Sequence, residues 1–452
     1  MNRFIVYKGG FLLGVLLLVS CSQPKLADDP LKRIDQEMAF TLEEEMIPAW
    51  YPRVLDTIEG GYLSDFDADW KQMGQQRKMI VTQARHVWTA AKLAEAYPEN
   101  DLFIRVAAHG IPYLAESMWD NENGGFYTLL SREGDMLDFD GRGKILKHAY
   151  GNAFAIYGLA AYVKVSGDTS ALHMAQDCFH WLEDHSHDAG YKGYFQFLEP
   201  DGTPLREGFN GVPPKDQNSS IHLLEAFTEL YHVWPDSLLK VRLEEMLVLI
   251  RDTIAHPKGY LRLFSYEDWT HLSYEDSSRQ FIERMANLDH VSFGHDIETA
   301  YLLMEAAEVL YGEVDERTLE RAKIMTDHSL RFGYDETVGG LYDEGYYFQG
   351  QAEPEIIKDT KNWWAQSETL NTLQIMAELY PDDPMRYEEK FIQQWAYIQT
   401  YLVDHTHGGW YIEGIDKKPG SRKSIKSGIW KGAYHTVRSL LNCLDRGENN
   451  HE

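Results

Sequence analysis

Two segments of the sequence place a histidine three positions before a charged residue. SFGHDIETAYLL carries His295 and Glu298, and WKGAYHTVRSLL carries His435 and Arg438. Residues three apart share one face of a helix, so each pair would present its side chains together, while Asp296 points elsewhere. Because imidazole gains and loses protons near neutral pH, the two segments offer general acid–base chemistry.

Other interpretations of these segments stay open on spacing alone. Glu298 could be a capping carboxylate beside a surface histidine, and the last segment could be purely structural. A His-x-x-Glu pair could also be half of a metal site, which is the interpretation that we favour least. We therefore predict no metal.

Three more segments carry side chains suited to binding a ligand. KDQNSSIHLLEAF places Asn218 and His222 four apart, on one helix face. QARHVW places Arg85 three residues before Trp88, and its long stem could reach a central cavity. KNWWAQSETL carries Trp363 and Trp364; adjacent helical residues diverge by about 100°, so only one indole could face the centre fully. Aromatic residues at such positions usually belong to the core, but flat indoles also suit the apolar faces of sugar rings.

Together, the stretches SFGHDIE, WKGAYH, KNWWAQSE, QARHVW, KHAYGNAFAIYGL and NSSIHLLEAFTELY resemble the N-acylglucosamine 2-epimerase superfamily, closest to its cellobiose and mannobiose 2-epimerase branch. They occur in order from about residue 80 to 440. The resemblance implies an (α/α)6 barrel and an isomerase that inverts C2 of the reducing-end aldose of a disaccharide such as cellobiose or β-1,4-mannobiose.

The resemblance also implies roles for individual residues. His295 and His435 would be the paired acid and base, with Arg85 near C2 and O2 of the sugar and Glu298 orienting a histidine. The sugar-binding residues would be Asn218, His222, Trp363, Trp364, Trp430, Tyr150 and Glu368. Ser220 stands where the family usually has histidine, and Asn152 where it often has glutamine, which bears on substrate fit.

The chemistry implied is removal of a weakly acidic C2 proton from the ring-opened aldehyde and its return on the other face. Two histidines can perform both transfers, and the charge of Arg85 would stabilise the enediolate. This scheme requires no cofactor. Alternatives are an aldose–ketose isomerase, an N-acylhexosamine 2-epimerase, a glycoside hydrolase or lyase on a helical toroid, and a non-catalytic sugar-binding protein. A hydrolase would need two carboxylates, with Glu298, Asp296 and Glu368 as candidates.

The elements that would position these residues repeat along the chain. A glycine followed by aromatic or bulky residues recurs six times at intervals of roughly 70 residues, as in Gly124-Gly125-Phe126-Tyr127. Between these turns lie pairs of segments with apolar residues at three- and four-residue intervals. The first helix of most pairs is apolar all round and the second is charged on one face, as expected for inner and outer helices.

These segments predict an all-α fold, in which six hairpins close into an (α/α)6 barrel with short β-hairpin loops at one mouth. A first helix near 32–57 and a last helix near 429–445 bring the predicted number of helices to twelve. An open helical solenoid is the alternative. We assign residues 32–446 to this single catalytic domain.

The N-terminus has the features of an export signal. Arg3 and Lys8 precede FLLGVLLLVS, an apolar run too short to span a bilayer. The run ends at LVSC, which resembles a bacterial lipoprotein signal and implies lipidation of Cys21. We predict a signal peptide over 1–20, a tether over 21–31, and an exported lipoprotein that is anchored in the membrane and periplasmic.

Bulk composition limits the partners. With 43 basic and 71 acidic residues the formal net charge is −28, so the surface would repel nucleic acid and anionic lipid. Cys178 and Cys443 are too few for a disulfide framework. The expected partners are a small-molecule sugar and, through Cys21 alone, the membrane; the protein would be a monomer or a weak homo-oligomer.

Overall fold

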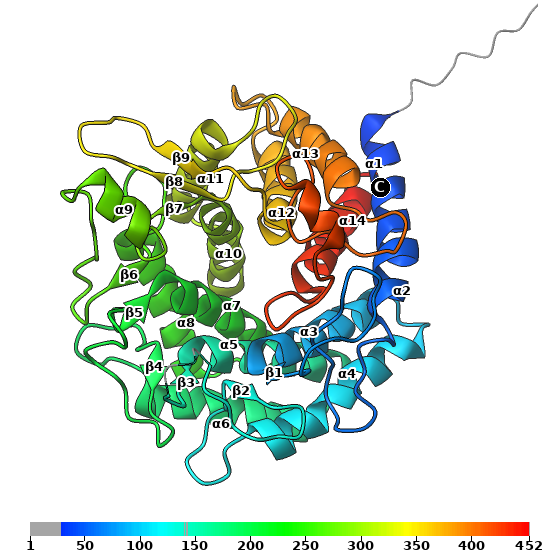
Figure 1. Cartoon of the computed structure of the whole chain (residues 1–452), viewed down its shortest axis with the longest axis vertical. Helices are drawn as coiled ribbons and strands as arrows, with labels where there is room; N and C mark the ends of the chain where they lie inside the picture. Colours follow the sequence, from blue (N-terminus) through cyan, green and yellow to red (C-terminus); the bar gives the residue numbers. More distant parts are fainter. Residues whose placement is uncertain (1–28, 140, 142, 452) are drawn as a thin grey trace, which may run out of the picture.

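The computed structural model describes residues 29–139, 141 and 143–451, and these form two concentric rings of helices (Figure 1). The inner ring consists of α3 (Ile80–Ala96), α5 (Ala149–Ser166), α7 (Gln217–Val233), α10 (Phe293–Tyr311), α12 (Trp363–Leu379) and α14 (Tyr434–His451). Each inner helix contacts the next, and α14 contacts α3. The ring is therefore closed, and the fold is the predicted (α/α)6 barrel, not an open solenoid.

The outer ring packs one helix behind each inner helix. Three outer helices continue into π-helical turns. The elements are α1 (Pro30–Phe40) with η1 (Thr41–Met46) and α2 (Ile47–Trp50), α4 (Asp101–Tyr113) with η2 (Leu114–Met118), α6 (Thr169–His185), α8 (Ser237–Leu249) with η3 (Ile250–Ile254), α11 (Glu316–Gly333) and α13 (Tyr387–Tyr401). A short 3-10 helix, η4 (Pro419–Lys423), and the helix α9 (Arg279–Met285) lie in loops, and α9 was not predicted.

The first and last predicted helices differ from the structure at their ends. The first helical segment ends at Trp50, not near 57, because Tyr51 is extended and precedes Pro52, which disfavours helical backbone in the residue before it. The last helix begins at Tyr434, not near 429. The five residues before it form a turn that carries Trp430 at the barrel mouth. Cys21, the expected lipidation site, lies outside the described residues.

Small residues let the inner helices approach one another closely. Most residues of α5 are buried, as expected for a helix with neighbours on every side. A Cβ on Gly158 would lie 2.6 Å from the carbonyl oxygen of Ala84 on α3. A larger residue at 158 would therefore push α5 away from α3 and widen the ring.

Short antiparallel strands mark one mouth of the barrel. The pairs are β1 (Lys78–Met79) with β2 (Leu129–Leu130), β3 (Lys147–His148) with β4 (Phe197–Leu198), and β5 (Lys215–Asp216) with β6 (Phe264–Ser265); β7 (Val291–Ser292), β8 (Glu344–Tyr346) and β9 (Glu355–Lys358) form a three-stranded sheet. The strands β1, β3, β5 and β7 each lead directly into an inner helix. The N-terminal ends of the inner helices therefore gather at this mouth.

The glycine turns end the outer helices, as the sequence predicts. Gly125 has φ +71°, and a Cβ there would lie 2.7 Å from the indole of Trp181. Trp119 and Phe126 form an antiparallel bridge across the turn. From the next inner helix, Asn152 Oδ1 accepts a hydrogen bond from the Phe126 amide at 2.8 Å. Asn152 therefore holds the turn and does not line the ligand cavity.

Five of the six turns are fastened by a buried lysine. In the second repeat, Lys147 is 1% exposed, and its Nζ donates to Asp120 Oδ2 at 2.7 Å and to the carbonyls of Gly124 and Pro200. Its counterparts pair with aspartates in the same way: Lys78 with Asp56, Lys215 with Asp188, Lys361 with Asp335, and Lys426 with Asp404. In the fourth repeat, His256 and Val291 occupy the corresponding positions, so the ammonium and the carboxylate are replaced together.

Among the described residues, no helix is long and apolar enough to cross a membrane. Cys178 and Cys443 are both buried and free. The described part of the barrel is thus held by packing, hydrogen bonds and ion pairs.

The lysine pairs generate a stability prediction. Lys147→Met should lower the free energy of unfolding by about 3–5 kcal/mol, because it leaves the Asp120 carboxylate buried without its cation. Asp120→Asn combined with Lys147→Met should lose less than Lys147→Met alone, since no buried charge then remains. Denaturant unfolding measures both.

Lys71→Met is the matched control. The Lys71 side chain is 75% exposed and pairs with Asp69 at the surface, so its loss should cost less than about 0.5 kcal/mol. Equal losses for the single and double Lys147 variants would contradict the assignment.

Candidate active site

A cavity of about 250 Å³ lies at the strand-bearing mouth of the barrel. Its walls come from the inner helices and from the turn before α14. The lining residues are Arg85, Tyr150, Asn218, His222, His295, Glu298, Trp363, Trp364, Trp430 and His435. Ten of the eleven residues proposed from the sequence thus meet around one space.

Glu368 is the exception. Its side chain is fully buried and does not line the cavity. Its Oε1 accepts a hydrogen bond from His435 Nδ1 at 2.6 Å and pairs with Arg438 at 2.7 Å. This carboxylate therefore lies behind His435 and can orient that imidazole, while a contact between Glu368 and the sugar stays a prediction.

His295 is held by a hydroxyl. Its Nδ1 lies 2.7 Å from Oγ of Ser292, which precedes the first residue of α10. The indole of Trp364 lies between the two histidines, with ring centroids 4.7 Å from His295 and 5.8 Å from His435. Among the described residues, no hydrogen bond engages Nε2 of either histidine, so this nitrogen remains for a ligand.

A third histidine has a similar arrangement. His222 Nδ1 lies 2.8 Å from Oε2 of Glu225, one turn further along α7. Both side chains are buried, and His222 lines the same cavity. Ser220, between Asn218 and His222 in the sequence, donates its hydroxyl to the Asp216 carbonyl and does not line the cavity. The cavity thus contains three oriented imidazoles, two of them backed by carboxylates.

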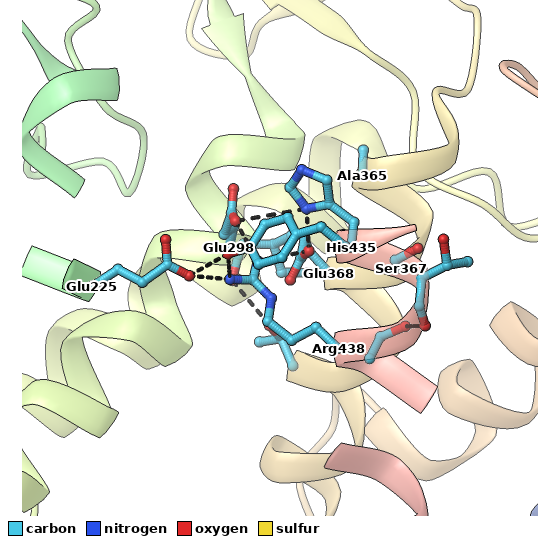
Figure 2. A network of polar contacts seen from close by, with 12 residues as sticks. Glu225, Glu298, Ala365, Ser367, Glu368, His435 and Arg438 are labelled. Atoms are coloured by element: carbon cyan, nitrogen blue, oxygen red, sulfur yellow. Dashed lines mark hydrogen bonds and ion pairs between the residues drawn. The ribbon is translucent and has the colours of Figure 1, made fainter. Parts of the chain in front are cut away.

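Arg438 connects these carboxylates (Figure 2). Its Nη2 lies 2.5 Å from Glu298 and 2.7 Å from Glu368, and its Nη1 pairs with Glu225. The four residues come from α14, α10, α12 and α7. One buried guanidinium therefore fixes the positions of the carboxylates that hydrogen-bond to His222 and His435.

The balance of charge in this network controls proton affinity. Burial raises the pKa of Glu298 and of Glu368 to about 7. Burial also opposes ionisation of Glu225, but the Arg438 charge and the His222 hydrogen bond together lower its pKa to about 2. Burial lowers the pKa of His295 to about 3 and that of His435 well below its usual range. At neutral pH both imidazoles are thus neutral and can act as bases.

Arg85 supplies the positive charge on the opposite wall. It is 5% exposed, stacks on Phe154 and Tyr434, and donates from Nη2 to the Tyr150 hydroxyl at 3.2 Å. Among the described residues, no ion pair joins it to a carboxylate. Its charge is therefore available to an anionic oxygen in the cavity.

Glu298, Glu368 and His435 have the composition of a metal site, because one ligand atom from each lies within 4.8 Å of the others. However, Arg438 Nη2 already contacts both carboxylates. The guanidinium occupies the carboxylate oxygens that a metal ion would need. The arrangement therefore favours an ion pair with Arg438 over a bound metal ion. Asp296 lies outside the cluster, where Oδ1 accepts a hydrogen bond from the Leu261 amide at 2.7 Å.

A second compartment of about 330 Å³ adjoins the first. The two share Tyr150, Asn218, His295 and Trp430 as walls. The outer compartment adds aromatic surface from Phe139, Phe197 and Phe264, and polar groups from Asp216, Gln217, Asn287 and His290. The mouth therefore offers two connected spaces, one of them facing the histidines.

Sequence reasoning missed Ser292 and Glu225 and gave Arg438 no role. Each stands three residues from a histidine: Ser292 before His295, Glu225 after His222, and Arg438 after His435. The same spacing that singled out Glu298 would have found them. What the spacing could not show is that Arg438 binds carboxylates from three other helices.

Comparison with known proteins shows the family of the chain. Residues 61–439 match the family model of N-acylglucosamine 2-epimerase. A cellobiose 2-epimerase of Bacteroides fragilis is 28% identical over 91% of this chain and 98% of its own, and one of Dictyoglomus turgidum is 26% identical over 92% and 99%. A D-mannose isomerase of Thermobifida fusca is 24% identical over 74% of this chain and 78% of its own.

Solved structures agree with the fold. The cellobiose 2-epimerase of Spirochaeta thermophila superposes with a TM-score of 0.80 and 28% identity, covering 95% of this chain and all of that one. A GH76 α-mannanase of Bacteroides thetaiotaomicron shares only the fold, with a TM-score of 0.55 and 11% identity over 94% of this chain and 98% of its own. With the family model matched over most of its length, the chain belongs to the N-acylglucosamine 2-epimerase family, and it is an isomerase of the epimerase class.

Proposed function

We propose that this protein inverts C2 of the reducing-end aldose of a disaccharide such as cellobiose or β-1,4-mannobiose. The observation that carries the proposal is the pair His295 and His435, which line one cavity with an arginine that has no carboxylate partner among the described residues. Neutral imidazoles can remove a proton, and the charge of Arg85 favours the anion that results.

The reaction begins from the ring-opened sugar, whose aldehyde makes the C2 proton weakly acidic. One imidazole takes this proton through Nε2 as electron density moves to O1, giving an enediolate. The other imidazole takes up a proton from solvent and, as imidazolium, gives it to the opposite face of C2 as electron density returns from O1. The first imidazole releases its proton to solvent, and the ring closes on the epimer. Glu368 stabilises the charge on His435 while that ring holds an extra proton.

The two compartments support a disaccharide as the substrate. The reducing unit would occupy the inner cavity beside the histidines, and the second unit would extend into the outer compartment past Trp430, which lines both. Five relatives of this chain carry the name cellobiose 2-epimerase, which supports a disaccharide as the proposed substrate.

Hydrogen exchange at C2 tests the proton transfer. Incubation of the enzyme with cellobiose in D2O should place deuterium at C2 of both epimers, as followed by NMR. His295→Asn and His435→Asn should each slow exchange by about 10²–10⁴-fold, because each removes a general acid–base group. His407→Asn, at an exposed histidine distant in sequence from the cavity residues, is the control.

Epimer formation without deuterium at C2 would contradict the mechanism. A rise in the number of reducing ends would indicate hydrolysis instead. Ketose as the main product would indicate that the proton returns to C1, as in an aldose–ketose isomerase.

The pKa values of the buried carboxyl groups predict a pH profile. Since the pKa of Glu368 is raised to about 7, lowering the pH through 7 protonates it and removes the charge that assists His435. We expect kcat/KM to fall on the acid side with an apparent pKa near 7. Glu368→Gln should lower the plateau and move this acid limb to lower pH. An unchanged limb in that variant would exclude Glu368 as its source.

A further inference from the structure

A further cavity, of about 400 Å³, lies toward the end of the barrel opposite the active site, and we call it the far cavity. Its lining residues belong to the middle and C-terminal parts of α3, α5, α7 and α10, whereas the active cavity lies at the N-terminal ends of the inner helices. His232 and Glu308, which line the far cavity, are exposed. The far cavity is therefore open to solvent at the other mouth of the barrel.

One hydrogen-bonded pair joins the two cavities. Glu225 lines the far cavity, and its Oε2 lies 2.8 Å from Nδ1 of His222, which lines the active cavity. The Tyr434 hydroxyl and Arg438 both contact Oε1 of Glu225 instead. Within the described part of the chain, His222 is thus the single hydrogen-bond partner of Oε2. A proton on Nδ1 of this imidazole has a direct path to a carboxyl group at the far cavity.

His222 and Glu225 belong to a polar stripe along α7. The stripe consists of Asn218, His222, Glu225, Glu229 and His232, and its spacing of four and three residues keeps all five on one helix face. The first two residues line the active cavity and the last three line the far cavity. Exposure rises from 4% for Glu225 to 9% for Glu229, and His232 is exposed. The stripe therefore leads from the buried site to solvent, over a rise of about 15 Å between the two histidines.

Packing of the inner ring does not require charged residues in this stripe. The neighbouring inner helix α5 also follows a strand, and its equivalent positions carry Tyr150, Phe154, Tyr157 and Ala161. Buried carboxylates are unfavourable unless they are paired, so each one on α7 needs its own cation. Glu225 is paired with Arg438. Glu229 is paired with Lys92, whose Nζ lies 2.8 Å from Oε1. The carboxylates of α7 thus need an explanation other than helix packing.

Glu305 of α10 brings a carboxyl group without a fixed partner to the far cavity. Among the residues that the structure describes, none forms a hydrogen bond or an ion pair with it. Burial and the nearby charges of Glu225 and Glu229 raise the pKa of Glu305 to about 7, against the effect of Arg438. A group with this pKa both gains and loses protons at neutral pH.

We propose that Glu225 and Glu305 pass protons between His222 and the solvent of the far cavity while a sugar fills the active cavity. This inference rests on the proposed function, in which each turnover releases one proton to solvent and takes up another. A sugar beside the histidines that extends past Trp430 would obstruct exchange through the strand-bearing mouth. The far cavity offers exchange a second route that this ligand does not occupy.

The protons balance over one turnover. On the outward passage, His222 gains a proton at Nε2 from the active cavity and gives its Nδ1 proton to Oε2 of Glu225. That proton continues through water to Glu305 and to the solvent, and the imidazole is left protonated at Nε2. On the inward passage, a proton from Glu225 binds Nδ1, and the Nε2 proton returns to the active cavity. Because each turnover needs one passage in each direction, His222 regains its starting tautomer.

The low pKa of Glu225 is compatible with this passage. At about 2, it lies about five units below neutral pH, so the protonated carboxyl group is present about 10⁻⁵ of the time. An elementary step with a limit of about 6 × 10¹² s⁻¹ then proceeds at about 10⁷ s⁻¹, which far exceeds common turnover numbers of about 1–10³ s⁻¹. Glu225 can therefore carry a proton transiently without retaining it.

Glu305→Gln tests the route, because it removes the ionisable group and keeps the size of the side chain. It should lower kcat for cellobiose about tenfold. The isotope effect of C2-deuterated cellobiose should shrink toward one, because proton exchange and not C–H cleavage then limits the rate, and the solvent isotope effect should grow. Imidazole added as a buffer, which can carry protons into the far cavity, should restore most of the lost kcat.

Two variants complete the test. Glu305→Asp keeps a carboxyl group and should stay within about twofold of the wild-type kcat. Glu244→Gln is the matched control, because this carboxylate lies on the outer helix α8 and accepts from the Tyr311 hydroxyl. Unfolding midpoints should be unchanged in all three variants.

Wild-type kcat in Glu305→Gln would overturn the inference. So would a loss of kcat with unchanged isotope effects and no rescue by imidazole, since that result indicates a structural role. Failure of the proposed function is distinct, because the wild-type enzyme would then exchange no C2 hydrogen of cellobiose.

Discussion

The site depends on one buried cation. Arg438 contacts Glu225, Glu298 and Glu368, which are carried by three different inner helices. Three carboxylates could not be buried together without it, because isolated buried charge is strongly unfavourable. With a single guanidinium among three acidic groups, two of them keep a pKa near 7. The arginine therefore fixes the position of the groups behind His222 and His435 and lowers their pKa values against the effect of burial.

The barrel brings these groups together by a simple rule. Each inner helix begins at the same mouth, so residues in its first turns face a common space. The lysine pairs fix the loops that lead into these helices, as Lys215 does by joining Asp188 to the strand before α7. Five of the six loops at this mouth are fastened in this way. The fourth repeat has no such ion pair, because His256 and Val291 stand in place of the aspartate and the lysine. This repeat leads into α10, the helix that carries His295.

The sequence predicted the ring and most of the cavity, because both follow from local periodicity. Inner helices show apolar residues on all sides, and Arg85, His295 and His435 fall in or near their first turns. The position of Glu368 behind His435 could not be predicted, because it depends on how α12 packs against α14 in the closed ring. The contacts of Arg438 join residues 140 and 213 positions apart, beyond any local pattern. The helix α9 escaped prediction because it is short and packs against its own small cluster of Ile282, Tyr346 and Phe348.

The inner and outer compartments differ in the kind of charged and polar groups that their proposed roles require. Proton transfer at C2 needs groups that change ionisation, and these are embedded in the Arg438 network below the histidines. Recognition of a second sugar needs surface for its ring, and the outer compartment offers Phe139, Phe197 and Phe264 outside that network. Asn218 and Trp430 line both spaces, so a substrate that spans them would contact both residues. Changes of specificity in the outer compartment can therefore leave the proton chemistry intact, which suits a family whose members act on different sugars.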